Sequence, residues 1–250
     1  MNFKIIHIDE TDSTNLWLRN SLGRVLSESV VEASLRTVPN EFCVVADYQT
    51  AGRGCRSNSW ESERGKNLTF SILIHPEEIP ANQQFRITET VSVALCETLE
   101  SYIYNKVEIK WPNDIYVGNK KICGILIENR LQGNSIKDSI IGIGLNVNQM
   151  VFESDAPNPV SIKQLTGQDL DIEEVLSNFL YHFESVSLRE TTCFDYRNRL
   201  FRRGKLSKYR DESGVFEAAL QDVMADGRLL LKDTEGMERT YAFKEVEFLI

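Results

Sequence analysis

The amino-acid sequence predicts an α+β fold, in which a mixed, largely antiparallel sheet with flanking helices is followed by a small C-terminal β-barrel. Two observations indicate the larger part: short apolar runs of strand type alternate with segments of helical period, and neighbouring runs are joined by turns too short for a parallel crossover. A third observation indicates the barrel. After about residue 204 the chain holds only short strand-like runs separated by turn signals.

Strands are expected where apolar and β-branched residues cluster between polar or glycine-bearing stretches. In the larger part these runs cover residues 4–8, 42–48, 68–75, 107–111, 115–117, 122–128 and 139–148. The short turns at Gly118 and Gly133 separate the last three runs, which indicates antiparallel pairing. In the C-terminal part the runs cover residues 215–220, 228–231, 240–243 and 246–250.

Helices are indicated where apolar residues recur at three- and four-residue steps. One such helix begins near Phe85, and a second begins at Asp171, which forms a capping-box pattern with Glu174. A shorter helix follows the first strand, with Asp12 or Ser13 as its N-cap. These helices supply the apolar faces that a sheet needs as cover.

A domain boundary is expected at about Gly204, between a larger domain of residues 1–203 and a barrel of residues 204–250. Residues 196–210 hold seven basic and no acidic side chains (Arg197, Arg199, Arg202, Arg203, Lys205, Lys208 and Arg210). We interpret this basic stretch as a solvated hinge, with a docking surface for ATP or an acidic carrier domain as the alternative.

Composition excludes several classes of protein. The 28 basic and 37 acidic side chains give the 250-residue chain a net charge of −9, which argues against nucleic-acid binding through bulk charge. Five cysteines without a C-x-x-C pair indicate reduced thiols, buried except for Cys55, and three scattered histidines form no local metal motif. Without a signal-peptide core or a run of about 20 apolar residues, we expect a cytoplasmic protein with no membrane partner.

The segment of residues 49–67, between the second and third predicted strands, is the first candidate site. It is long for a plain connection in a compact domain. Gly52 and Gly54 permit close approach of a ligand to the backbone, and Arg53 and Arg56 supply planar donors for phosphate or carboxylate. No acidic residue precedes the tryptophan of this loop, so it forms a local basic patch. A flexible surface loop is the alternative interpretation.

The second candidate site is the run from Lys110 to Gly124. Pro112 restricts the residue before it to an extended conformation, which would hold Asn113 and Asp114 at a fixed place near a strand end. Further along, Lys121 offers a point charge to a ligand carboxylate or phosphate, and the glycine three residues later leaves room for a flat group. A role in solubilising a hairpin suits the neighbouring lysine, residue 120, better than Lys121.

Five motifs, in this order, resemble those of biotin protein ligases over nearly the whole chain. They are Ser13-Thr14-Asn15, the Gly52-Arg53-Gly54 loop that ends in Trp60, Lys110-Trp111-Pro112-Asn113-Asp114, Lys121-x-x-Gly124-Ile-Leu, and Gly142-Ile-Gly144-Leu-Asn146-Val-Asn148. The resemblance implies a class II synthetase-like catalytic domain and an SH3-like C-terminal barrel. It also implies the single-function type without an N-terminal DNA-binding domain, because the first predicted strand begins so early in the chain.

The activity that this resemblance implies is ATP-dependent biotin–carrier protein ligation in two steps. The carboxylate of biotin attacks the α-phosphate of ATP to give biotinyl-AMP and pyrophosphate, and a lysine of a biotin carboxyl carrier protein then attacks the mixed anhydride. Both nucleophiles are substrates, so no protein nucleophile is expected. Mg²⁺ is expected to arrive with ATP, with Asp114 as a possible neighbour and no firm ligand set. The chain would act as a monomer or homodimer.

By the same resemblance, the catalytic residues are Lys121 and Arg53. The residues expected to bind biotin are Ser13, Thr14, Asn15, Gln49, Arg53, Gly54, Cys55, Lys121 and Gly124. The residues expected to bind ATP or the adenylate are Arg53, Arg56, Trp60, Trp111, Asn113, Asp114, Lys121 and Asn146.

Several of these assignments keep an alternative. Trp60 and Trp111 would wall the adenylate or belong to the core, and Asp114 would contact ATP or orient a neighbouring lysine. Gly142 and Gly144 would lie against biotin or mark a strand irregularity. Many relatives carry Gly-Arg-Gly-Arg where this chain has cysteine at residue 55, so only the backbone is carried over at that position.

Two other functions remain as alternatives at this stage. One is a lipoate or octanoate ligase or transferase of the same superfamily, and the other is a non-catalytic biotin sensor.

Overall fold

The computed structural model describes residues 3–21, 41–54, 59–76, 78–153 and 158–250. The chain divides into two compact units, which are Met1–Ala81 with Lys121–Leu180 and Asn82–Lys120 with Tyr181–Ile250. Among the described helices, none has the length and apolar character that crossing a bilayer requires.

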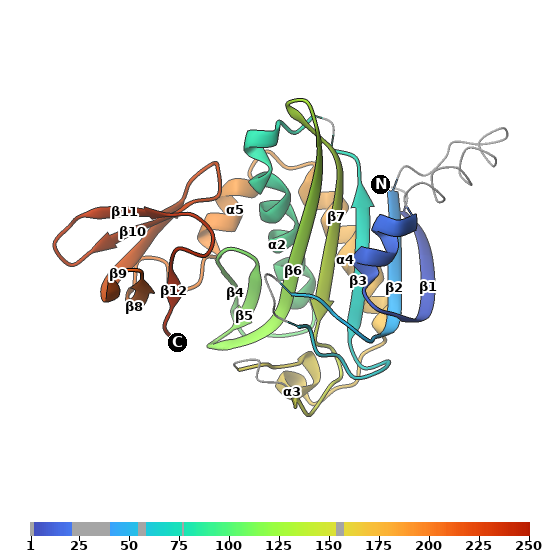
Figure 1. Ribbon diagram of the computed structural model, residues 1–250. Coiled ribbons are helices and arrows are strands. Elements are labelled where there is room, and N and C mark those ends of the chain that lie inside the picture. The colour runs from blue at the N-terminus through green and yellow to red at the C-terminus, as the bar shows by residue number, and fades with distance from the viewer. Residues whose placement is uncertain (1–2, 22–40, 55–58, 77, 154–157) are drawn as a thin grey trace. The chain divides into compact units, whose positions relative to one another are not determined.

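The first unit is built on a sheet in which the strands lie in the order β1-β2-β3-β7-β6 (Figure 1). Their bounds are β1 (Phe3–Thr11), β2 (Glu41–Gln49), β3 (Leu68–Ile74), β6 (Lys120–Gln132) and β7 (Ser135–Leu145). β1 runs parallel to β2, and the other three pairs are antiparallel. The predicted mixed, largely antiparallel sheet is therefore confirmed. The short helix α3 (Ile162–Thr166), which the sequence pattern did not indicate, also belongs to this unit.

Both faces of this sheet are covered, which explains why every residue of β3 is buried. On one face, Phe179 of helix α4 (Ile172–Ser187) packs edge-on against Phe70, with ring centroids 5.2 Å apart. On the other face, Leu18 from the helix of residues 14–21 packs with Val44 of β2 and Leu73 of β3. That helix begins at Ser13, whose carbonyl accepts a 2.8 Å bond from the backbone of the fourth residue on.

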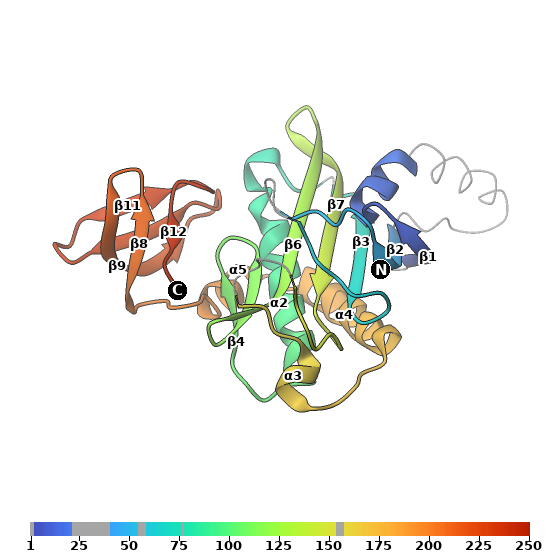
Figure 2. The same cartoon turned by 60° about the horizontal axis from the view of Figure 1, so that its bottom comes forward.

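The second unit contains helix α2 (Phe85–Glu100), a β4–β5 hairpin and a separate five-stranded antiparallel sheet, which Figure 2 shows from a second direction. The elements not yet given are η1 (Ala81–Gln83), β4 (Val107–Lys110), β5 (Asp114–Val117), α5 (Thr192–Asn198), β8 (Leu206–Asp211), β9 (Gly214–Val223), β10 (Leu229–Asp233), β11 (Glu238–Tyr241) and β12 (Glu247–Phe248). The small sheet has the order β11-β10-β9-β8-β12, and its described strands do not close between β11 and β12. Its SH3-like character and the boundary at Gly204 stay predictions.

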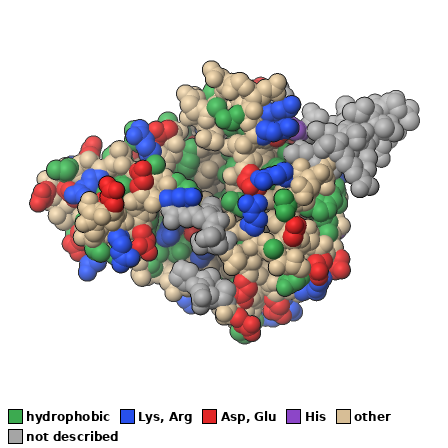
Figure 3. Space-filling model, in the orientation of Figure 1, with side chains coloured by type: hydrophobic (Ala, Val, Ile, Leu, Met, Phe, Trp, Pro, Cys, Tyr) green, Lys and Arg blue, Asp and Glu red, His purple; other side chains and the backbone are tan. Residues whose placement is uncertain are grey.

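The basic stretch is not a solvated hinge throughout, because its second half forms strand β8. Tyr209 is fully buried there and stacks on Phe216 with ring centroids 5.9 Å apart, so the strand has an apolar face. Several of the cations are paired locally: Arg197 with Asp222, Arg199 with Glu100, and Arg210 with Glu247. In Figure 3, acidic and basic side chains are likewise interspersed over the small sheet.

The cysteines follow the prediction with one exception. Cys43, Cys96 and Cys123 are buried, and burial raises the pKa of the Cys43 thiol to about 12, which keeps it protonated. Cys193, in contrast, is exposed, so the prediction that it is buried is wrong. It lies on helix α5, which the hydrophobic pattern did not reveal and which is only seven residues long. Cys55 lies outside the described residues.

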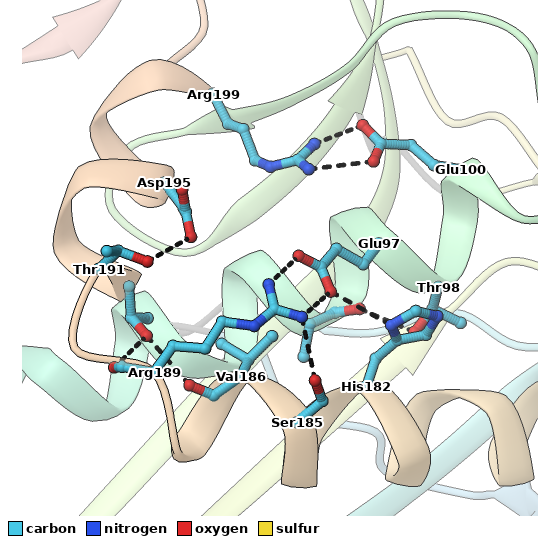
Figure 4. Close-up of polar contacts among 12 residues, drawn as sticks. Glu97, Thr98, Glu100, His182, Ser185, Val186, Arg189, Thr191, Asp195 and Arg199 are labelled. Atoms are coloured by element: carbon cyan, nitrogen blue, oxygen red, sulfur yellow. Dashed lines mark hydrogen bonds and ion pairs between the residues drawn. The ribbon is translucent and has the colours of Figure 1, made fainter.

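A polar cluster in the second unit gives a prediction for stability. The Glu97 carboxylate accepts hydrogen bonds from Arg189, at 3.0 Å to Nη2, and lies 3.2 Å from Nδ1 of His182 (Figure 4). Its side chain is 17% exposed, whereas that of Glu100, which pairs with Arg199, is 41% exposed. Glu97→Gln should lower the free energy of unfolding by about 2 kcal/mol, and Glu100→Gln by less than about 1 kcal/mol. Urea denaturation of both variants checks this, and equal losses would contradict it.

The same cluster predicts how the contribution of Glu97 to stability depends on pH. Burial alone would raise the pKa of Glu97, but hydrogen bonds and charge from Arg189 and then His182 hold that pKa below the ordinary value of 4.5. A carboxyl whose pKa is depressed in the folded state contributes stability above its unfolded pKa and loses it as the pH falls through the folded value. The difference in stability between wild type and Glu97→Gln should therefore be full at neutral pH and shrink below about pH 4.5.

Candidate functional site

The floor of the site is one face of the sheet at a point where large side chains are absent. Gly124 of β6 and Gly144 of β7 lie directly opposite each other, and Gly142 lies opposite Ser71 of β3. A Cβ added to Gly142 would lie 2.3 Å from Oδ1 of Asn15, and one added to Gly144 would lie 2.2 Å from the Trp60 indole. The glycines are therefore required for close packing of these two side chains, while their contact with biotin stays a prediction.

A buried polar network joins the Ser13-Thr14-Asn15 motif to strands β2 and β3. The backbone N–H of Thr14 donates to Oε1 of Gln49 at 2.8 Å, and the Thr14 hydroxyl lies 3.2 Å from the same oxygen. Oγ of Ser71 lies 2.6 Å from both Thr14 Oγ1 and Asn15 Oδ1. All three motif residues are at most 3% exposed, so the hydrogen bonds within this network must satisfy groups that water does not reach.

Glu128, near the end of β6, connects this network to the arginines. Its Oε2 accepts a 3.0 Å hydrogen bond from Nδ2 of Asn15. Its Oε1 pairs with Arg19 and lies 3.7 Å from Nη1 of Arg53 in the Gly-Arg-Gly loop. The carboxylate thus contacts the helix of residues 14–21 and the loop at the same time.

Lys121 and Trp60 lie beside the glycine floor. The backbone of Lys121 is fixed on both sides, because its N–H donates to Asn158 O at 2.8 Å and its carbonyl accepts from Val160 N at 2.9 Å. Its Nζ lies 5.7 Å from the centroid of the Trp60 ring and would lie 3.2 Å from a Cβ added to Gly124. A cation is therefore held beside the glycine floor, where it could pair with an anionic ligand.

Two of the predicted site residues each carry one buried polar atom that has no hydrogen-bond partner among the described residues. One is Nε1 of Trp60 and the other is Oδ1 of Asn146. The amide nitrogen of Asn146 does have a partner, because it donates to Val160 O at 3.1 Å. An unsatisfied buried donor and acceptor are costly unless a ligand or water completes them, which favours the predicted ligand-binding role of both residues.

Three further predicted residues, Trp111, Asn113 and Asp114, lie in the second unit. The contacts of Trp111 and the strand pairing of Asp114 are with other residues of that unit. Trp111 is 3% exposed, donates from Nε1 to Gly227 O at 2.9 Å and meets the Phe243 ring edge-on. Asp114 lies opposite Lys110 in the β4–β5 ladder. Both observations favour the core and lysine-orienting alternatives. The roles of Trp111, Asn113 and Asp114 toward ATP stay predictions.

Two predicted residues, Cys55 and Arg56, lie outside the described residues. No group of three or more His, Cys, Asp or Glu side chains that could hold a metal ion occurs in the part of the chain that the structure describes.

Sequence reasoning missed Ser71 and Glu128. Each gave a weak signal: Ser71 is a polar residue in the middle of an otherwise buried strand, where it must find a partner, and Glu128 ends an apolar run. Their partner, Asn15, is more than fifty residues away along the chain from either one. No local pattern reveals such a contact.

Comparison with known proteins identifies the family. The family model described as the biotin/lipoate A/B protein ligase family matches residues 22–146, half of the 250-residue chain. The bifunctional ligase/repressor BirA of Bacillus spizizenii is 31% identical over 228 residues, which cover 84% of this chain and 67% of that protein. This chain belongs to the biotin/lipoate A/B protein ligase family.

Further relatives extend the match. The biotin–[acetyl-CoA-carboxylase] ligase of Mycobacterium tuberculosis is 25% identical over 233 residues, covering 90% of this chain and 81% of its own length. Among solved structures, the biotin protein ligase of Aquifex aeolicus in complex with biotin and ATP has a TM-score of 0.75 at 26% identity and covers 97% of each chain. The predicted α+β fold of this family is therefore confirmed.

Proposed function

We propose that this chain is an ATP-dependent biotin protein ligase, which activates biotin as biotinyl-AMP and transfers it to a lysine of a biotin carboxyl carrier protein. The observation that supports this most is the glycine floor with the Thr14–Gln49–Ser71–Asn15 network on one side and Lys121 on the other. It offers a small polar head group donors and acceptors, and it places a cation beside the glycine floor.

In the proposed first step, a carboxylate oxygen of biotin attacks the α-phosphorus of ATP, and the bond from that phosphorus to the bridging oxygen of pyrophosphate breaks. Two anions must approach each other, and negative charge develops on the phosphoryl oxygens. Fixed cations lower this barrier by positioning the reactants and stabilising the developing charge. We assign this work to Lys121 and Arg53.

In the proposed second step, the neutral amine of the carrier lysine attacks the carbonyl carbon of the mixed anhydride. An amide bond forms, AMP leaves, and the amine loses a proton. The site needs no nucleophile of its own, because both attacking groups belong to substrates. Its contribution is to hold the anhydride away from water until the lysine arrives.

Mg²⁺ is proposed to enter with ATP. It commonly binds through phosphate oxygens, waters and one or two carboxylates, so it does not need a preformed cluster. Asp114 is the proposed neighbouring carboxylate. When bound, the ion would neutralise charge on the phosphates.

The test is biotin-dependent ATP–pyrophosphate exchange, measured with biotin, lipoate and octanoate in turn. Of these three acids, only biotin is expected to support exchange. Exchange with lipoate or octanoate instead would identify the chain as a lipoate or octanoate ligase of the same family. A protein that binds biotin tightly but catalyses no exchange would be a sensor and not a ligase.

A further inference from the structure

The side-chain amide of Asn15 occupies a position where its orientation matters. An amide can present either its oxygen, an acceptor, or its nitrogen, a donor, with almost no change of shape. Asn15 lies directly on Gly142, so which amide atom lies nearest to that glycine depends on what holds the other atom. Its oxygen is the atom nearest to that glycine, at 2.3 Å from the position of an added Cβ.

Three partners hold this amide, two on the β6 side and one on the β3 side. On the β6 side, Nδ2 donates to Oε2 of Glu128 at 3.0 Å and to the carbonyl of Leu126 at 3.3 Å. On the β3 side, Oδ1 lies 2.6 Å from the hydroxyl of Ser71. An ionised carboxylate only accepts hydrogen bonds, whereas a hydroxyl both donates and accepts. The Glu128 carboxylate and the Leu126 carbonyl, which both only accept, therefore set which way the amide points, and Glu128 makes the shorter of the two bonds.

The surroundings of Glu128 suit this role. Its side chain is 20% exposed, and Arg19 and Arg53 lie near its other oxygen and compensate its charge from that side. Hydrogen bonds to a charged acceptor are shorter and stronger than those between neutral groups. The hydrogen bond from Asn15 to Glu128 is consequently stronger than one to a neutral side chain at position 128 would be.

We propose that Glu128 is a positioning residue for biotin recognition, because it fixes the Asn15 amide with its oxygen over Gly142 and so sets the pattern of donors and acceptors that the ureido ring of biotin meets. The proposal rests on the proposed function of the site. It adds a residue that makes no contact with the reacting atoms and acts through another side chain.

The test uses Glu128→Gln, which keeps the shape but removes the charge and leaves the Leu126 carbonyl as the one acceptor-only partner of Nδ2 given above. Arg19→Gln is the matched control, because it removes a partner of the same carboxylate and leaves the Asn15 bond in place. In ATP–pyrophosphate exchange we expect the KM for biotin to rise about tenfold in Glu128→Gln, with kcat within about twofold of wild type. In Arg19→Gln the KM for biotin should change by less than about twofold.

A second measurement responds to orientation and not to stability. In 2-iminobiotin the ureido oxygen is replaced by an imino group, which exchanges an acceptor for a group that also donates. Glu128→Gln should lower the ratio of kcat/KM for biotin over 2-iminobiotin by at least about threefold, because the relaxed amide can meet either ligand. Arg19→Gln should keep the wild-type ratio.

Three outcomes are decisive. Unchanged KM and unchanged ratio in a folded Glu128→Gln variant would overturn the proposal, and so would equal effects in Arg19→Gln. If Glu128→Gln does not fold, Glu128→Asp is used in its place. The shorter side chain keeps the charge but moves it away from Asn15, and the same rise in the KM for biotin is expected. Absence of biotin-dependent exchange in the wild type would instead refute the proposed function, so the two failures are distinguishable.

Discussion

Lys121→Ala is expected to slow biotin-dependent ATP–pyrophosphate exchange by roughly 10²- to 10³-fold, the loss typical of removing one fixed group that stabilises developing charge. The backbone on both sides of Lys121 is held by the bonds to Asn158 and Val160, and its Nζ lies at the edge of the glycine floor beside Trp60. Steady-state exchange at saturating biotin and ATP measures the effect.

Lys120→Ala is the matched control for this prediction. Lys120 is the preceding residue on the same strand and is exposed, so its removal should leave exchange within about twofold of wild type. The assignment of Lys121 would be wrong if Lys121→Ala retained more than a third of the wild-type rate, or if both variants lost activity equally.

Gly142→Ala is expected to weaken biotin binding by at least about tenfold. The new Cβ would lie 2.3 Å from Oδ1 and 2.9 Å from Cγ of Asn15. Asn15 cannot retreat without breaking its bonds to Ser71 and Glu128, so either the polar network or the floor must shift. Overpacking of this kind also costs about 1–3 kcal/mol of stability. Isothermal titration with biotin gives the dissociation constant, and urea denaturation gives the stability.

Gly133→Ala separates the binding effect from the loss of stability. Gly133 lies in the β6–β7 turn at a φ of +60°, with nothing within 4 Å of an added Cβ. An alanine there is strained by about 1 kcal/mol, but it is far along both strands from the floor glycines. It should lose stability and keep wild-type affinity for biotin. Equal affinity in both variants would refute the close-packed floor.

The fold was predictable from the sequence because its signals are local. The apolar runs located the strands of both sheets except β8, and the turn at Gly133 indicated the antiparallel β6–β7 pair that carries the floor glycines. Strand β8 was hidden because its cations dominate its composition, while its burial depends on Tyr209 meeting aromatic rings from other strands. A single buried tyrosine among basic residues produces no alternating apolar pattern.

The site was predictable only where its residues form compact motifs. The Ser13-Thr14-Asn15 motif, Gln49, Trp60 and Lys121 are all found in the first unit, as parts of runs that the sequence alone distinguishes. Ser71 and Glu128 belong to no such run, and their importance follows from hydrogen bonds to Asn15 that only folding creates. For Trp111 the motif is easy to recognise in the sequence, but the motif did not reveal the packing role. The indole N–H donates a hydrogen bond to the carbonyl of Gly227, which is distant in the chain.

The most direct test of the proposed ligase activity is to look for the activated intermediate itself. The protein is incubated with biotin and α-labelled ATP in the absence of carrier protein, freed of small molecules by rapid gel filtration, and then mixed with a biotin carboxyl carrier domain. Labelled biotinyl-AMP is expected to stay with the protein, and the carrier lysine is then expected to become biotinylated as labelled AMP is released, with no further ATP. Biotinylation that appears only when ATP is added again, with no adenylate retained on the protein, would contradict it.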